Sequence, residues 1–271
     1  MTRLVKQLVY GGIYLAIILG IVWLFYRALV PAPTCTDGIR NGGEDGVDCG
    51  VAACGTLCPV EVKPLETTAP VIIKNGDGST DVLIHLENPN PLYGASRVDY
   101  TLSVTSADGS SLATRRGTTY VNPAQPSYVD FPLGHLTSDA AKAELQFTAA
   151  DVQWNALTVD AKGDIQFGVR DEQMTPASAS YRYSATVINQ SKFTFDSVDV
   201  TVLLTDSSGK LVGAGSTVMR TLATGEQRGV VLDWPFAVPG VTRAQAVVTT
   251  NVFANANFIR TYGVPGQSQG F

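Results

Sequence analysis

An uninterrupted apolar stretch near the N-terminus constrains this chain more than any other feature. Residues 8–26 read LVYGGIYLAIILGIVWLFY and contain no charged side chain. At a rise of about 1.5 Å per residue this stretch forms about 28 Å of helix, close to the hydrocarbon thickness of a bilayer. We therefore predict one transmembrane helix over residues 8–30.

The basic residues around the stretch predict its orientation. Arg3 and Lys6 precede it, whereas Arg27 alone follows it before Arg40. The positive-inside rule places residues 1–7 in the cytoplasm and the C-terminal domains outside the plasma membrane. A cleaved secretory signal shares the basic start and the apolar core, but the small-residue cleavage site is missing, so we favour an uncleaved, single-pass signal anchor.

The chain beyond this anchor is acidic. Of 19 basic and 24 acidic residues, three bases and no acid lie in residues 1–30, which leaves a net charge of −8 on the remainder. Such a surface repels nucleic-acid phosphates. We expect no nucleic-acid partner, and expect contacts with the membrane and either another envelope protein or a second copy of the chain.

All four cysteines lie in a short segment directly after the anchor: Cys35, Cys49, Cys54 and Cys58. An even number of cysteines in an exported segment predicts disulfides. A zinc site is the alternative, but Cys35 stands apart from the others, whereas four-thiolate sites pair their ligands closely. The sequence does not choose among the possible pairings.

Oxygen-bearing side chains recur between these cysteines, at Asp37, Asn41, Glu44, Asp45 and Asp48. Calcium binds several such oxygens from one short glycine-containing loop. The same residue types also form turns in a small disulfide knot that holds no metal. Calcium is the one cofactor that the sequence suggests. The alternative is that the knot has a structural role alone.

The segment also resembles a cysteine box of exported bacterial proteins with the pattern CxDGxxNxxExxxDCGGxCxxC. The residues on its fixed positions are Cys35, Asp37, Gly38, Asn41, Glu44, Asp48, Cys49 and Gly50. The chain departs from the pattern at Val51 and in the spacing of its last two cysteines. The resemblance implies a bacterial envelope protein.

Beyond a proline-rich segment over 59–70, which predicts an extended spacer, the chain repeats itself. Residues 97–106 read RVDYTLSVTS and residues 197–206 read SVDVTVLLTD. Apolar side chains alternate at 98, 100, 102 and 104 and at 198, 200, 202 and 204, as in strands with one buried face. Asn88 and Asn189 precede these strands at matching places. The repeat predicts two homologous domains.

Each copy consists of short alternating runs separated by Gly, Pro, Asn or Asp, and the whole chain has 26 glycines and 14 prolines. This pattern predicts a mainly β protein with two tandem Ig-like antiparallel β-sandwiches, closed by final strands near 152–159 and 252–260. The second copy resembles the FxLYD family of extracellular β-sandwich modules. The residues that carry this resemblance are Asn189, the strand 198–206, the run 209–212 (GKLV), Leu222, Gly225 and Glu226.

These observations predict seven segments: a cytoplasmic N-terminus (1–7), the anchor (8–30), the cysteine box (31–58), the spacer (59–70), two sandwiches (71–160 and 161–262) and a flexible tail (263–271).

No catalytic motif stands out in the sequence. The two histidines are His85 and His135, and no nucleophile elbow, phosphate-cradling loop or H-E-x-x-H motif is present. Carboxylate pairs such as Asp130 with Asp151, or Asp196 with Asp199, fall on strands and turns, where we expect them to be solvated. We expect a protein that is not an enzyme.

We therefore predict a membrane-anchored bacterial envelope protein whose sandwiches bind another protein in a structural or assembly role. A solute- or glycan-binding receptor is one alternative, with the aromatic residues Tyr93, Tyr120, Phe193 and Phe195 as a ligand face rather than core. An accessory subunit of a secretion or pilus complex is the other.

Overall fold

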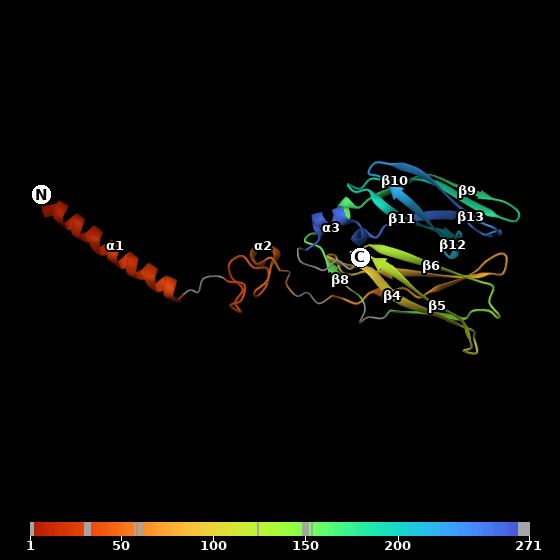
Figure 1. Ribbon diagram of the computed structural model, residues 1–271, viewed down its shortest axis with the longest axis horizontal. Helices are drawn as coiled ribbons and strands as arrows, with labels where there is room; N and C mark the ends of the chain where they lie inside the picture. Colours follow the sequence, from red (N-terminus) through yellow and green to blue (C-terminus); the bar gives the residue numbers. More distant parts are fainter. Residues whose placement is uncertain are drawn as a thin grey trace. The chain divides into compact units, whose positions relative to one another are not determined.

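The computed structural model describes residues 3–29, 34–56, 58, 62–123, 125–147, 152 and 154–264 (Figure 1). The chain divides into two compact units, Met1–Val60 and Glu61–Phe271. Strands account for 49% and helices for 16% of the protein. The predicted mainly β fold, with an apolar N-terminal helix, a disulfide knot and two β-sandwiches, is confirmed.

The first unit contains helix α1 (Arg3–Leu29) and the cysteine knot with the short helix α2 (Val51–Cys54). Within α1, the segment Val5–Arg27 is long and apolar enough to cross a membrane, and none of its most apolar window is buried by protein. A helix that is hydrophobic all round and packs against nothing is stable in lipid rather than in water.

Within the described residues of the second unit, sandwich 1 is built from eight strands. They are β1 (Glu66–Thr67), β2 (Val71–Lys74), β3 (Thr80–Glu87), β4 (Tyr93–Thr105), β5 (Ser111–Val121), β6 (Pro126–Gly134), β7 (Lys142–Phe147) and β8 (Trp154–Ala156). In one antiparallel sheet β3 pairs with β6 along one edge and with β1 and β2 along the other. In the other sheet β4 pairs with β5 along one edge and with β7 and β8 along the other.

Sandwich 2 follows the 3-10 helix η2 (Lys162–Asp164). Its elements are β9 (Phe167–Pro176), β10 (Tyr181–Asn189), β11 (Phe195–Thr205), β12 (Leu211–Leu222), β13 (Gln227–Trp234), β14 (Arg243–Thr249), the 3-10 helix η3 (Val252–Ala254) and helix α3 (Ala256–Tyr262). Its sheets have the orders β13-β10-β9 and β12-β11-β14.

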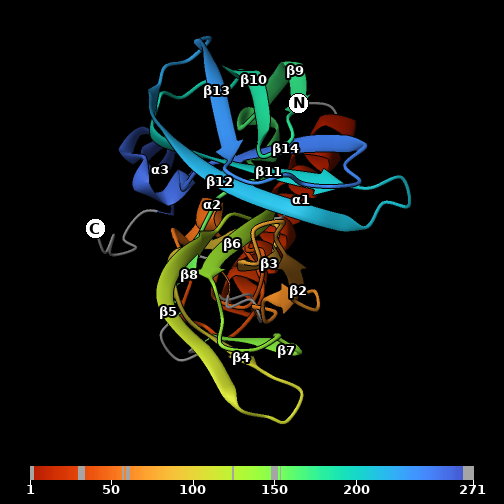
Figure 2. The same cartoon turned by 90° about the vertical axis from the view of Figure 1, so that its right-hand side faces the viewer.

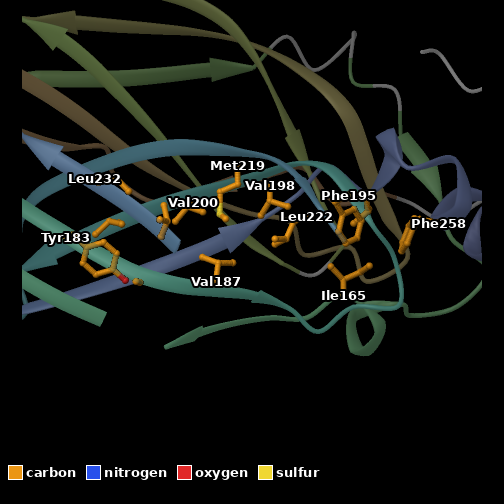
Figure 3. Close-up of a cluster of buried hydrophobic side chains, with 14 of the residues drawn as sticks. Ile165, Tyr183, Val187, Phe195, Val198, Val200, Met219, Leu222, Leu232 and Phe258 are labelled. Atoms are coloured by element: carbon orange, nitrogen blue, oxygen red, sulfur yellow. The ribbon is translucent and has the colours of Figure 1, made fainter. Parts of the chain in front are cut away.

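The alternating residues of the repeat form the two cores, as predicted. Val98, Leu102 and Val104 are fully buried in sandwich 1, and Tyr100 packs against them. On β11, the alternating residues Val198, Val200, Val202 and Leu204 are fully buried in the core of sandwich 2. In Figure 3, side chains from β10, β11, β12 and β13 meet around Val200, Met219 and Leu232 between the two sheets of sandwich 2.

A buried asparagine holds the same corner of each sandwich. The side-chain amide of Asn88 donates to the carbonyls of Tyr93 and Asn122, and that of Asn189 donates to the carbonyls of Phe193 and Leu222. In both, the amide oxygen accepts from the main chain two residues further on. Since buried amides are costly unless bonded, this shared device supports a duplication.

The two sandwiches pack face to face, each through one of its two sheets, and we call these two sheets the middle sheets. Ile73 and Leu83 of sandwich 1 form an apolar cluster with Leu203 and Ala214 of sandwich 2. Figure 2 shows the resulting stack, with β4, β5 and β7 at the bottom, then β2, β3 and β6, then β11, β12 and β14, and β9, β10 and β13 at the top. Strand β11 is therefore buried on both faces, whereas the sequence pattern predicted only one buried face.

Gly94 shows how closely the sandwiches approach. A Cβ atom at this position would lie 2.5 Å from Cε2 of Phe253 in η3. No side chain is tolerated at such a distance, so only glycine fits there.

The segment predicted as a spacer is extended but, where the structure describes it, belongs to sandwich 1. Strand β1 pairs with β3, as β9 pairs with β10. The Asn90 side chain bonds both the N–H and the carbonyl of Lys63, just as the Ser191 hydroxyl bonds both groups of Gln166. Residues 59–61 lie outside the described residues.

The predicted final strand over 252–260 is wrong. Asn251 and Asn255 accept hydrogen bonds from the main-chain N–H groups that begin η3 and α3, so capping produces two short helices instead of a strand. In sandwich 1 the final strand is only β8, inside the predicted 152–159. Of the predicted tail, Gly263 forms a bridge with Leu157, and residues 265–271 lie outside the described residues.

The face assignment of β11 generates a stability prediction. Val202→Asp places a charge in a dry core, and we expect a loss of more than about 4 kcal/mol in the free energy of unfolding. The control is Val231→Asp on β13, where the valine is 53% exposed, and it should cost no more than about 1 kcal/mol. Urea unfolding followed by tryptophan fluorescence measures both. Equal stabilities would show that Val202 does not face the core.

Candidate functional site in a groove between the sandwiches

Two disulfides hold the knot, Cys35–Cys54 and Cys49–Cys58, with Cα–Cα distances of 5.6 and 4.8 Å. Both separations lie in the usual disulfide range. A Cβ atom on Gly46 would lie 2.7 Å from Sγ of Cys58 and 2.8 Å from Sγ of Cys49. The glycine is therefore required where the chain passes over this disulfide.

Of the residues predicted to bind calcium, Asp37, Glu44 and Asp48 accept hydrogen bonds inside the knot, whereas Asn41 Oδ1 is buried and has no hydrogen-bond partner among the described residues. Asp37 accepts from Ile39 N–H and the Asn41 side chain, Asp48 accepts from Gly38 N–H, and Glu44 accepts from the N–H groups of Asn41 and Asp48. Asp45 is exposed. The hydrogen bond from Asn41 is the largest cause that lowers the pKa of Asp37.

The described residues bring together one group with metal-ligand spacing, Cys35, Glu44 and Cys54, within 4.8 Å. Both of its cysteines are joined in a disulfide, so their sulfurs are not thiolate ligands. The carboxylates of the knot act as turn acceptors, and calcium binding by Asp37, Asn41, Glu44, Asp45 and Asp48 stays a prediction.

A different polar site lies between the sandwiches, in a groove of about 290 Å³ that we call the inter-sandwich groove. Strands β5 and β6 of sandwich 1 and strands β11, β12 and β14 of sandwich 2 line it. The lining residues are Thr118, Thr119, Tyr120, Ser127, Tyr128, Val129, Asp130, Asp199, Thr201, Ser216, Thr217, Val218 and Thr249. Eleven of these thirteen side chains carry a hydroxyl or a carboxylate.

Tyr120 connects the two sandwiches across this groove. Its hydroxyl donates to Oδ2 of Asp199 at 2.6 Å and lies 2.9 Å from the hydroxyl of Thr249. Burial and the nearby Asp199 charge raise the pKa of Tyr120, so it remains a donor. Burial also raises the pKa of Asp199, which the hydrogen bond from Tyr120 partly offsets.

Asp130 has no comparable partner. Its Oδ1 atom is buried and makes no hydrogen bond within the described part of the chain. Burial, and then the charge of Asp81 on β3, raise the pKa of Asp130 to about 7. Asp81 accepts from the Asn75 side-chain amide at 2.8 Å, but burial still raises its pKa.

The aromatic residues and the carboxylate pairs that the sequence offered as candidate sites do not come together as sites in the structure. Phe195 is buried, Phe193 packs on Phe195 and Phe258, and Tyr93 is half-buried, so these residues do not form an exposed aromatic ligand face. Asp130 and Asp199, which we expected to be fully solvated, are half-buried, and burial raises the pKa of each. Asp196 is exposed, and Asp151 lies outside the described residues.

No family model and no curated protein matches the chain. Among solved structures, it is similar to the exo-chitosanase CsxA of Amycolatopsis orientalis, with 14% identity and a TM-score of 0.22, over 67% of this chain and 26% of that one. A β-glucuronidase from glycoside hydrolase family 2 has 8% identity and a TM-score of 0.23, over 65% and 22%. A putative β-galactosidase from Bacteroides fragilis has 9% identity and a TM-score of 0.22, over 66% and 32%.

These matches contradict the prediction that the chain is not an enzyme, because the similar structures are glycoside hydrolases. We do not retain that prediction. The chain spans less than a third of each hydrolase, and the likeness is one of β-sandwich domains. At these TM-scores it carries no argument for a hydrolytic activity of this chain.

The raised pKa of Asp130 predicts a pH-dependent stability. Between the ordinary value of 3.8 and about 7, the unfolded chain has lost a proton that the folded protein retains. Stability therefore falls as the pH rises through this range. Asp130→Asn should remove this slope and, above about pH 7, stabilise the protein by about 4 kcal/mol relative to wild type.

Thermal and urea unfolding between about pH 4 and pH 8 measure the difference. Asp171→Asn is the matched control, because Asp171 is exposed and its φ of 55° suits asparagine. A wild-type profile parallel to that of Asp130→Asn would contradict the buried state of the carboxyl.

Proposed function

We propose that this chain is a single-pass bacterial envelope protein with a cytoplasmic N-terminus, and that its two-sandwich body binds another envelope protein outside the plasma membrane. The bare apolar surface of α1 supports the membrane anchor. The two disulfides support an oxidising, extracytoplasmic compartment for the rest of the chain.

The free edge of β5 is the observation that carries the binding role. Strand β5 pairs with β4 on one side, in unbroken register from Ala113 to Thr119, and no strand of the described chain pairs with its other side. Thr114, Arg115, Arg116 and Thr118 are exposed along it. A long regular edge offers main-chain hydrogen bonds to an added strand, and its arginines favour an acidic one.

Strand β9 differs from β5 at its edge. It has a register shift beside Asp171, it carries charged side chains at Arg170, Asp171 and Glu172, and it ends at Pro176. Bulges, charges and prolines discourage strand addition. The comparison favours β5 over β9 as the contact edge.

The orientation is tested by protease accessibility. Protease added to intact spheroplasts should remove the sandwiches and leave α1 in the membrane, because the body lies on the accessible side of the bilayer. Immunoblots with tags at each end of the full-length protein measure this. A body that is cleaved only after lysis would place it in the cytoplasm and refute the proposed topology.

The partner edge is tested by photocrosslinking in living cells. A photoreactive residue at Arg116 on β5 should give a crosslinked species that contains another envelope protein. The same residue at Lys162, which is exposed in η2, should not. Mass spectrometry identifies the crosslinked chain. Equal crosslinking from both positions, or none from Arg116, would contradict a partner on the β5 edge.

A further inference from the structure

One buried polar atom in the inter-sandwich groove lacks a partner. Within the described part of the second unit, the buried side-chain oxygens without a hydrogen bond are Asp130 Oδ1 and Ser127 Oγ, both on β6. Side chains alternate along a strand, so Asp130 shares the inter-sandwich face of β6 with Tyr128, whereas Ser127 shares the opposite face with Val129, which packs in the core of sandwich 1. Buried polar atoms are bonded in nearly all native proteins, so the Asp130 oxygen in the groove points to a group that comes from outside the chain.

The charge of the groove limits what that group can be. Among its lining residues the charged side chains are Asp130 and Asp199, and no Lys, Arg or His is present. Asp81 adds a third carboxylate behind Asp130. The ion pairs found in the described residues include none of these three acids. A bound cation would compensate the charge that burial penalises.

The site does not have the geometry of a metal centre. Among the described residues, Asp81, Asp130 and Asp199 do not form a group with three ligand atoms within 4.8 Å. The hydroxyls around Asp130 are instead weak, neutral acceptors that suit the several N–H donors of one organic cation. A volume of about 290 Å³ holds such a group together with ordered water.

We propose that the inter-sandwich groove binds a primary ammonium group, which donates to Asp130 Oδ1 and to hydroxyl oxygens that line the groove. The ammonium belongs either to a free amine or to a lysine side chain of a partner protein. The groove borders the end of β5 at Thr118, but Asp130 lies on β6, and the crosslinking position Arg116 does not line the groove. Failure of this proposal would therefore leave the crosslinking prediction unaffected, and the converse also holds.

The groups that face Asp130 set the pH dependence of binding. They are Asp81 and His85 on β3, Tyr128 on β6, Tyr120 on β5 and Asp199 on β11, and the lining residues of β12 carry no titratable side chain. The ammonium binds the ionised carboxylate. Affinity should therefore rise about tenfold from pH 6 to pH 8, as a carboxyl with a pKa of about 7 ionises.

The test is calorimetric titration of the full-length protein in detergent micelles and phosphate buffer. The probes are methylammonium, which carries the charge alone, and Nα-acetyl-lysine methylamide, in which peptide groups flank the lysine. The uncharged control is Nα-acetyl-norleucine methylamide. Binding of methylammonium alone assigns the groove to a free amine, and tighter binding of the lysine probe assigns it to a protein lysine.

Variants make the assignment specific to Asp130. Asp130→Asn should abolish saturable binding at pH 8, whereas Asp171→Asn, on exposed β9, should leave it unchanged. Absence of saturable binding of either charged probe at pH 8 would overturn the proposal, and so would equal binding by Asp130→Asn or by the norleucine control. In each of these cases ordered water satisfies Asp130 Oδ1.

Discussion

Face-to-face packing of the two middle sheets is the interaction on which the body of this protein depends. Strand β11 buries Val200, Val202 and Leu204 in its own core, and its other face buries Leu203 against Ile73 and Leu83 of sandwich 1. Burying such a leucine contributes about 1.5–3 kcal/mol relative to exposure. The two repeats are therefore not independent modules on a string. Removing one repeat would expose the apolar face of the other, so partner binding is better mapped with surface substitutions than with deletions.

The duplication explains why the first sandwich begins earlier than its hydrophobic pattern indicates. In the second copy one long edge strand, β9, pairs along β10, and in the first copy β1 and β2 together pair along the same side of β3. The connecting residues 68–70 end in a proline, Pro70, which lacks the N–H needed for a continuous ladder. The edge strand is thus divided, and its first half was predicted as a spacer because prolines dominate that segment.

Local patterns predicted the anchor, the cysteine knot and the inward faces of β4 and β11 because each depends on residues close in sequence. The inter-sandwich groove could not be predicted in this way, since Tyr120, Asp130 and Asp199 come from different strands and meet only when the sandwiches pack. The sequence contains one signal that β11 packs against a second sheet. The run 200–204 (VTVLL) departs from alternation, because Leu203 is apolar at an outward position. Such a residue indicates a strand that is covered on both faces. The strand predicted over 252–260 is absent because the side chains of Asn251 and Asn255 cap two short helices there, which overrides the β-propensity of the segment.

The acids of the groove make the interface less stable than an apolar one of the same shape would be. The Tyr120 hydroxyl donates a hydrogen bond to Asp199, which partly compensates the burial of this carboxylate. The same hydrogen bond fixes the position of one sandwich relative to the other. Asp130 lacks a comparable partner for Oδ1, and its ionised form is disfavoured where the protein is expected to work, near neutral pH. An asparagine or a leucine would avoid this cost. A carboxyl that destabilises the empty body, in a groove lined by hydroxyls and free of bases, is the arrangement expected where a cation from outside completes the structure.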